Sequence, residues 1–487
     1  MENPILFWNA VVLEANRLDH TGSMEGENQA GPPKSSRAVA IVHLAMHDAY
    51  FGVAGVAAIP GPSTPAKRLY LTTPPSYAGG DSPVRRSAAV SGAAATALVT
   101  LYSNQRIFID AKVAEIAGSN GTDDTAFSFG RLVAQAVLAT RAGDASLLAA
   151  DEDHVASPGV SRHRKDPCNP NQPYLGVAYG LAKTFAVTTW QTLNPPPSPT
   201  TAAYLKDLKE VYEKGGASGL QSTKRTPDQT TVGLYWAYDG AMQIGTPPRL
   251  YNQIVREVAV ARSNTVEDSA RLFALVNCAM GDAGIHAWHY KYCHDFWRPV
   301  VGIREHDKST GPTAVPDKAI TPPCDPGWKP LGSPRSNEPK PGFTPPFPAY
   351  PSGHATFGAA AFEMVRLFYR LRDNLTFQDD GEDAIAFAFI SDEMNGATTE
   401  ADGSVRTRHA RQYDGMAEAI HDNSVSRVFL GVHWRFDGTS GDSVKKMLKA
   451  TDKIGGVPLG RGIAQDIFAS GMHQQPTAPT APPTGCV

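Results

Sequence analysis

The chain has 487 residues, of which 41% are hydrophobic and 19% charged, and its formal net charge is −3. This composition is typical of a soluble globular protein with one large or two medium-sized domains, and it gives no indication of a nucleic-acid surface. No run of about 18 apolar residues occurs, so we expect no membrane span. The first 17 residues have no basic segment ahead of an apolar one, so we expect no conventional signal peptide.

Apolar residues recur at helical spacing along most of the chain, whereas alternating strand patterns are scarce. The fold is therefore predicted to be mainly α, with two helical bundles packed together and long loops rich in proline and glycine. A Pro-Pro-Pro-Ser-Pro run at 195–199 is the candidate boundary between an N-terminal half (1–200) and a C-terminal half (201–473), and 474–487 should be a disordered tail. Predicted helices cover 5–16, 35–53, 85–101, 105–117, 122–143, 201–214, 227–243, 247–264, 267–298, 355–371, 384–395 and 414–429.

The cysteines and the paired histidines favour no metal centre. Five cysteines are widely spread without a C-x-x-C motif, which argues against a disulfide framework and structural zinc. Cys278 and Cys293 have helical apolar surroundings and are interpreted as small core residues, while a disulfide between the loop residues Cys168 and Cys324 stays open. His43 and His47 lie one turn apart, but only Asp48 is nearby as a third ligand, so core or polar contacts are the favoured interpretation.

The stretch from Ala349 to Phe357 has the layout of a helix N-terminus prepared for an anion. Ser352 can cap the helix, and Gly353 lets a ligand approach the backbone closely. The first helical amides have no partner within the helix and carry the positive end of its dipole. His354 follows, where it can exchange a proton with a bound group.

A second segment, 288–299, contains Lys291 and Arg298 seven residues apart, which predicts two cations on one face of a helix that Pro299 ends. Trp288 precedes Lys291 by one turn on the same face. Because the flanking tryptophans and phenylalanine favour burial, these cations need an anionic partner, although a nearby aspartate could supply one.

A third segment, 426–437, contains Arg427 and His433, with Gly431 breaking the helix between them so that both can face one point. Asp437 can accept a proton from one imidazole nitrogen of His433 and so fix which nitrogen is free. Together the three segments predict an oxyanion cage of three cations, neutral donors and two histidines, namely Lys291, Arg298, Ser352, Gly353, His354, Arg427 and His433.

These motifs, Lys-x6-Arg-Pro, Pro-Ser-Gly-His and Ser-Arg-x5-His-x3-Asp, resemble in this order the three signatures of the vanadium haloperoxidase and type 2 phosphatidic acid phosphatase superfamily. Segments outside the cage, at 5–9, 43–51, 235–240, 244–252, 347–358 and 455–460, are similar to the fungal-type vanadium chloroperoxidases. The similarity covers nearly the whole chain and implies two four-helix bundles.

The resemblance implies that His433 is the single protein ligand of a trigonal-bipyramidal vanadate(V), and therefore its metal ligand. His354 would be the acid/base beside the apical oxygen, and Asp239 would support Arg427. The equatorial oxygens would be held by Lys291, Arg298, Ser352, Gly353 and Arg427.

Two further residues, Trp288 and Phe347, match the halide side of the site in that family. Relatives that prefer bromide usually carry histidine at the position of Phe347, so phenylalanine favours chloride-type activity.

The resemblance thus implies a vanadate-dependent haloperoxidase that oxidises chloride or bromide with hydrogen peroxide to hypohalous acid, which then halogenates small organic acceptors. Lys291, His354 and His433 would be its catalytic residues, and phosphate would compete with vanadate. The alternative is a soluble acid phosphatase in which His433 attacks phosphorus. A monomer or small homo-oligomer is expected, and the location stays open, since the sequence favours the cytoplasm and the family analogy favours secretion.

Overall fold

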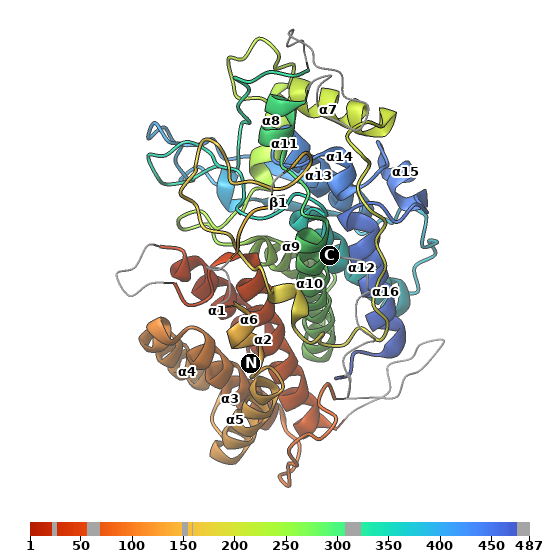
Figure 1. The fold of residues 1–487 in the computed structure, drawn as a ribbon. Helices are drawn as coiled ribbons and strands as arrows, with labels where there is room; N and C mark the ends of the chain where they lie inside the picture. The colour runs from red at the N-terminus through yellow and green to blue at the C-terminus, as the bar shows by residue number, and fades with distance from the viewer. Residues whose placement is uncertain (22–26, 56–68, 149–153, 158, 307–322, 475–487) are drawn as a thin grey trace.

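The computed structural model describes residues 1–21, 27–55, 69–148, 154–157, 159–306 and 323–474. Its fold is mainly α, as predicted (Figure 1). Side chains of Asn3, Ser82 and Asp123 cap the starts of three N-terminal helices, which explains why those helices begin there. The N-terminal part comprises α1 (Pro4–Asp19), α2 (Gly31–Ala54), α3 (Pro83–Leu101), α4 (Arg106–Asn120), α5 (Asp124–Ala139) and the short α6 (Asp144–Leu148).

The C-terminal part adds longer helices around the predicted cage and shorter ones in its connections. Three 3₁₀ turns occur at Ser103–Gln105, Tyr179–Leu181 and Asp392–Met394. The helices are α7 (Ala202–Lys214), α8 (Pro227–Tyr235), α9 (Pro247–Ala261), α10 (Val266–His294), α11 (Pro299–Glu305), α12 (Gly353–Arg372), α13 (Met416–Phe429), α14 (Arg435–Gly438), α15 (Val444–Lys449) and α16 (Gly456–Ser470).

The long helix α10 lies at the centre of the molecule and joins its two parts (Figure 1). It packs against α2 on the N-terminal side and against α12 and α16 on the C-terminal side. Residues 269–288 of α10 are all buried, as expected of a helix that has protein on every side. One hydrophobic core therefore runs through both parts, and the division at residue 200 stays a prediction.

Helix α16 was not predicted, although it packs closely along α12. Its sequence contains Pro458 and several glycines, which lower helix propensity and hide the pattern. The glycines are needed for the packing, because a Cβ added at Gly460 would lie 2.2 Å from the carbonyl oxygen of Thr356. Tertiary contact therefore outweighs local propensity here.

The predicted helix at 384–395 is wrong. Residues Phe387–Ile390 form strand β1, which pairs antiparallel with β2 (Ala410–Tyr413), and Phe387 lies opposite Tyr413. Ile385 and Phe387 are buried while the alanines between and after them are exposed, so this segment has the period of a strand. Its many alanines had favoured a helix.

The two helices that lead to the cage end earlier than predicted. Helix α8 ends at Tyr235, since Tyr238 and Gly240 have positive φ and turn the chain. Helix α10 ends at His294, where Asp295 adopts the left-handed conformation. Pro299 does not end α10 but starts α11, where a missing N–H costs nothing.

The structure describes four of the five cysteines, and they agree with the sequence prediction only in part. No disulfide joins Cys168 and Cys324. Cys278 is buried and free as predicted, whereas Cys293, in the half-buried last turn of α10, is disulfide-bonded and is no core thiol. Within the described ranges, no helix has both the length and the apolar character to cross a membrane. The predicted tail lies outside the described residues, except for Gln474.

Candidate active site

The N-terminus of α12 forms the floor of the predicted cage. Ser352 is its N-cap, and its side-chain oxygen accepts a hydrogen bond from the amide of Ala355 at 3.4 Å. The backbone amide of Ser352 donates to the carbonyl of Asp437 at 2.8 Å, which ties this helix start to α14. The amide of Gly353 is in the first turn, where helical N–H groups have no partner within the helix.

Lys291 is fully buried at the end of α10, and its ammonium group is held by backbone alone. Its Nζ donates to the carbonyl oxygens of Pro348, Ala349 and Pro351 at 2.9, 3.2 and 2.6 Å. An ammonium group has three N–H donors, so all three are used. Lys291 therefore supplies positive charge to the cage and fixes the turn before Ser352, and an anion must displace a carbonyl to bond it directly.

Arg298 reaches the cage from the N-cap position of α11 and is also fully buried. Its Nε donates to the carbonyl of Phe347 at 2.9 Å, and Nη1 donates to the carbonyl of Val432 at 2.8 Å and contacts Nε2 of His433 at 2.9 Å. Among the described residues Nη2 has no hydrogen-bond partner. A buried guanidinium N–H without a partner is costly, and an anion would satisfy it.

Arg427 lies in the last turn of α13 and is fully buried. Its Nη2 donates to both carboxylate oxygens of Asp239, at 2.8 and 3.0 Å, and to the hydroxyl of Ser333 at 3.2 Å. Nε and Nη1 have no partner within the described part of the chain. The helix ends at Phe429 with Leu430 as its C-cap, and the positive φ of Gly431 turns the chain toward His433, as the sequence predicted.

The hydrogen bonds of His433 define its tautomer. Arg298 can only donate, so Nε2 of His433 is the acceptor and carries no hydrogen. Nδ1–H then donates to the carboxylate of Asp437 at 2.7 Å. Burial raises the pKa of Asp437 to about 8, although Lys291 and Arg298 act in the opposite direction. The imidazole therefore presents an unprotonated nitrogen, the form in which histidine binds a metal.

His354 lies in the first turn of α12, with its Nε2 2.5 Å from the carbonyl oxygen of Ala237 and 4.0 Å from Oδ1 of Asp239. A carbonyl accepts, so Nε2 carries the hydrogen and Nδ1 is free to accept a proton. Burial lowers the pKa of His354 to about 3, and the charge of Arg427 contributes to this shift. His354 is therefore a neutral base in the folded protein.

Phosphate in the cage should raise the pKa of His354. The anion would offset the charges of Arg427 and Lys291 and would favour the imidazolium form, so the direction is upward from about 3. The shift can be followed from the ring proton signals of histidine by NMR, in apoprotein with and without phosphate. His354→Ala assigns the signal, and an unchanged titration would place the anion away from this residue.

The charges and free donors of the cage together fit an oxyanion. The cage contains three buried cations and two acidic side chains, Asp239 and Asp437. Burial raises the pKa of Asp437 and so favours its neutral, protonated form. Three nitrogens of the two arginines have no partner among the described residues, and a tetrahedral oxyanion would accept hydrogen bonds from them. No group of three or more metal-ligating side chains occurs among the described residues.

Two aromatic rings border the cage. The rings of Trp288 and Phe347 are 4.9 Å apart, and Nζ of Lys291 lies 4.9 Å from the centre of the Phe347 ring. The guanidinium carbon of Arg298 is 5.0 Å from that centre. Phe347 is 7% exposed, so this apolar surface lies next to two cations and is shielded from water.

Some residues that organise the cage could not be found from sequence. Ser333 bonds Arg427, and backbone carbonyls of Ala237 and Val432 hold His354 and Arg298. Ser333 lies in an irregular loop without a motif, and a carbonyl contact is independent of side-chain identity. The loop at 306–348 supplies Ser333 and Phe347, while its residues 307–322 lie outside the described part.

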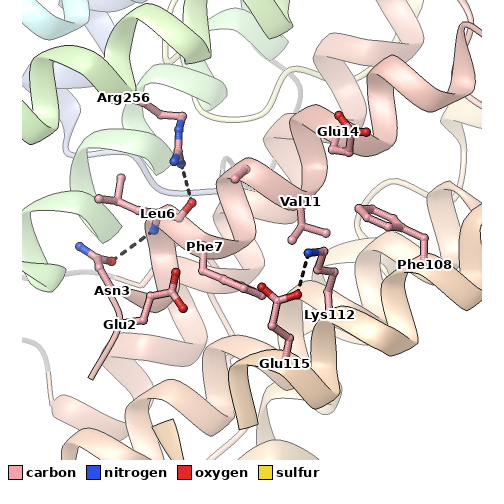
Figure 2. A pocket seen from close by; sticks show the side chains of 11 residues that line it. Glu2, Asn3, Leu6, Phe7, Val11, Glu14, Phe108, Lys112, Glu115 and Arg256 are labelled. Atoms are coloured by element: carbon pink, nitrogen blue, oxygen red, sulfur yellow. Dashed lines mark hydrogen bonds and ion pairs between the residues drawn. The ribbon is translucent and has the colours of Figure 1, made fainter. Parts of the chain in front are cut away.

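His43, His47 and a pocket at the N-terminal helices are separate from this cage. His43 is bonded to the Val39 carbonyl and Asn9, and His47 to Asp48, which confirms their interpretation as polar contacts. Figure 2 shows a pocket of about 660 Å³ between α1 and α4. Phe7 and Phe108 are among the residues that line this pocket, and none of its lining residues belongs to the oxyanion cage.

The fold and this site define a mainly α protein with a buried oxyanion site that offers one unprotonated imidazole nitrogen as a ligand. The family model "Vanadium chloroperoxidase N-terminal domain" matches residues 1–173, and "VCPO second helical-bundle domain" matches residues 271–448. Vanadium chloroperoxidase from Curvularia inaequalis is 36% identical over 99% of this chain and 92% of its own. The chain belongs to the vanadium chloroperoxidase family.

Solved structures share the fold. A bacterial vanadium-dependent iodoperoxidase matches with a TM-score of 0.64 at 17% identity, covering 95% of each chain. An apo-type bacterial vanadium-dependent chloroperoxidase matches with a TM-score of 0.54 at 15% identity, covering 91% of this chain and 95% of its own.

Proposed function

We propose that this protein is a vanadate-dependent haloperoxidase that oxidises both chloride and bromide with hydrogen peroxide to hypohalous acid. One observation carries the proposal: the unprotonated Nε2 of His433 lies within a buried set of cations whose arginines have free N–H groups. Family membership supports the reaction class. The phosphatase alternative is not favoured, because the relative that matches nearly the full chain is a chloroperoxidase.

In this proposal vanadate is bound through Nε2 of His433, and Asp437 holds that ring in place. The free N–H groups of Arg298 and Arg427 would bond its oxygens, helped by the Ser352 hydroxyl and the Gly353 amide. Lys291 would contribute charge and a donor released from one of its carbonyls. Bound vanadate would act as a Lewis acid that activates hydrogen peroxide.

His354 would take the proton that hydrogen peroxide releases. Its low pKa keeps the ring neutral and ready to accept, and Asp239 lies close enough to stabilise the cation that results. Ala237 fixes the ring through Nε2, so Nδ1 is the atom that accepts the proton. Asp239 would also orient Arg427.

The halide would bind beside Phe347 and Trp288. The two cations near the Phe347 ring attract an anion, and the apolar rings keep water away and so strengthen that attraction. A small organic acceptor would then react with hypohalous acid outside the cage.

The halide range tests the finer part of the proposal. Apoprotein would be incubated with orthovanadate, hydrogen peroxide and chloride, bromide or iodide, and halogenation of monochlorodimedone followed. We expect turnover of chloride and bromide, and inhibition by phosphate in competition with vanadate. Turnover of bromide or iodide without chloride would overturn the chloride assignment.

Phe347→His should lower the kcat/KM ratio of chloride to bromide by about tenfold. The imidazole would admit water beside the halide and weaken the field of Lys291 and Arg298, which affects the more strongly hydrated chloride most. Phe343→His is the matched control, because Phe343 lies in the same loop and its ring is 4.7 Å from Arg335 instead of the cage cations. An equal change in both variants would contradict the assignment of Phe347.

A further inference from the structure

A short loop segment that carries a buried histidine pairs with the chain immediately before Arg298. The amide of His163 donates to the carbonyl of Asp295 at 2.8 Å, and the amide of Trp297 donates to the carbonyl of Ser161 at 2.8 Å. This antiparallel contact fixes residue 163 against the backbone that leads into the oxyanion cage. None of the three cage motifs includes it.

The side chains around His163 leave several polar atoms without partners. His163 is 2% exposed, and neither of its ring nitrogens has a hydrogen-bond partner among the described residues. Its ring lies 5.8 Å from that of Tyr174, which in turn lies 4.5 Å from the ring of His154. Nε2 of His154 is likewise buried without a partner in the described ranges. The buried carboxylate of Asp295 lies close to the Ser157 hydroxyl and the His163 amide. Buried polar atoms of this kind are normally satisfied by internal water.

This cluster, His154, His163, Tyr174 and Asp295, reaches the segment that leads into the cage, because the amide of His163 is bonded to the carbonyl of Asp295, three residues before Arg298. His154 is half-buried, while His163 is sealed. Burial lowers the pKa of His163 well below its usual value, and the charges of Arg298, Lys291, His154 and Arg164 contribute to this shift. The two cage cations are therefore close enough to act on this ring. A neutral imidazole has one donor and one acceptor nitrogen, so it can receive a proton on one side and release one on the other.

The proposed reaction needs such a supply of protons. Hydrogen peroxide, halide and one proton give hypohalous acid and water: the halide loses two electrons, the peroxide O–O bond breaks, and one oxygen leaves as water. The proton that peroxide passes to His354 belongs to hydrogen peroxide and is returned to the products, so one further proton must enter from solvent in each turnover. Every ionisable group of the cage is buried, so buried groups and internal water beside the cage can bring this proton in.

We propose that His163, together with water held between His154 and Asp295, conducts protons from solvent to the Arg298 side of the oxyanion cage. His163 is in this view a proton-relay residue that acts through water and does not touch the reacting atoms. The proposal rests on the haloperoxidase function proposed above.

The first test compares His163→Ala and His163→Gln with wild-type protein in bromide oxidation across pH. We expect kcat to fall by about 10-fold or more, with a larger loss at higher pH where protons are scarce. Added imidazole should restore the rate of His163→Ala, because it can occupy the space and carry the proton. His289→Ala is the control, since this half-buried histidine on α10 meets the Trp190 ring edge to face, away from the cage, and should show neither loss nor rescue.

The second test does not depend on turnover. Vanadate affinity of the apoprotein, measured by calorimetry, should be the same in wild type and both His163 variants. Hydrogen–deuterium exchange at the imidazole C2 position, followed by mass spectrometry, should be faster at His163 than at His43. Both rings are almost fully buried, but both ring nitrogens of His43 are hydrogen-bonded to protein atoms.

Exchange at His163 as slow as at His43 would overturn the proposal, as would a loss of rate that imidazole cannot rescue and that follows a loss of vanadate affinity. The second result would assign His163 a structural role. Absence of haloperoxidase activity in wild-type protein would instead reject the proposed function, and the exchange measurement would still report whether water reaches His163.

Discussion

Replacing His433 with alanine should abolish vanadate-dependent halogenation and lower the vanadate affinity by at least about 10²-fold. Nε2 of His433 is the nitrogen that faces Arg298 without a hydrogen, and we propose it as the only protein ligand of vanadium. Changes to residues that merely orient a ligand already cost about 10- to 100-fold, so loss of the ligand itself should cost more. Titration of apoprotein with orthovanadate, alongside the halogenation assay, measures both effects.

His409→Ala is the control for this substitution, because His409 is exposed and lies beyond the cage. It should leave affinity and turnover unchanged. Phosphate affinity of His433→Ala separates ligand loss from collapse of the site: the arginine donors remain, so phosphate should still bind. Vanadate-dependent halogenation retained in His433→Ala would contradict the assignment of His433 as the ligand of vanadium.

Replacing Arg427 with lysine should lower phosphate and vanadate affinity by about 10- to 100-fold although the charge is kept. Nε and Nη1 of Arg427 are the free N–H groups, and an ammonium at this position cannot reproduce their planar geometry. A hydrogen bond to a charged group contributes about 1.5–3 kcal/mol, which corresponds to this range. Calorimetric titration of apoprotein with each anion gives the change directly.

Arg435→Lys is the matched control. Arg435 is also largely buried and bonds both carboxylate oxygens of Glu210 at 2.6 Å, outside the cage. The Arg435→Lys variant should have a lower free energy of unfolding but the same affinity for phosphate and vanadate as wild-type protein. Equal anion affinity in Arg427→Lys and wild-type protein would mean that charge alone holds the oxyanion and that the free N–H groups are not used.

Helices with regular apolar patterns and clear end signals were predictable from the sequence. Ser352 caps α12 and Gly431 follows the end of α13, because capping and left-handed turns depend on one or two residues. The end of α10 was misplaced, because Asp295 adopts a left-handed conformation that few local signals reveal. Helix α16 and strand β1 were missed, since contacts with α12 and with β2 decide their conformation more than their composition does.

The chemical types in the site were also readable, because charge and donor capacity belong to the side chain itself. Three cations, two histidines and Asp437 could be named from motif spacing, and the family resemblance that followed from them added Asp239. The prediction that Lys291 and Arg298 share one helix is wrong, because α10 ends at His294 and Arg298 reaches the cage from the start of α11. The motif therefore identified Arg298 as a cage residue, although the helical geometry used to place it was incorrect.

The sequence by itself determined that this protein is mainly helical and which side chains could form its oxyanion cage. Only the tertiary structure decided how their hydrogen bonds are distributed. All three N–H donors of Lys291 bond backbone carbonyls, whereas Arg298 and Arg427 have N–H groups without a partner among the described residues. The physical reason is that donor capacity is a property of a residue, whereas its availability depends on which carbonyls and carboxylates distant segments bring within about 3 Å.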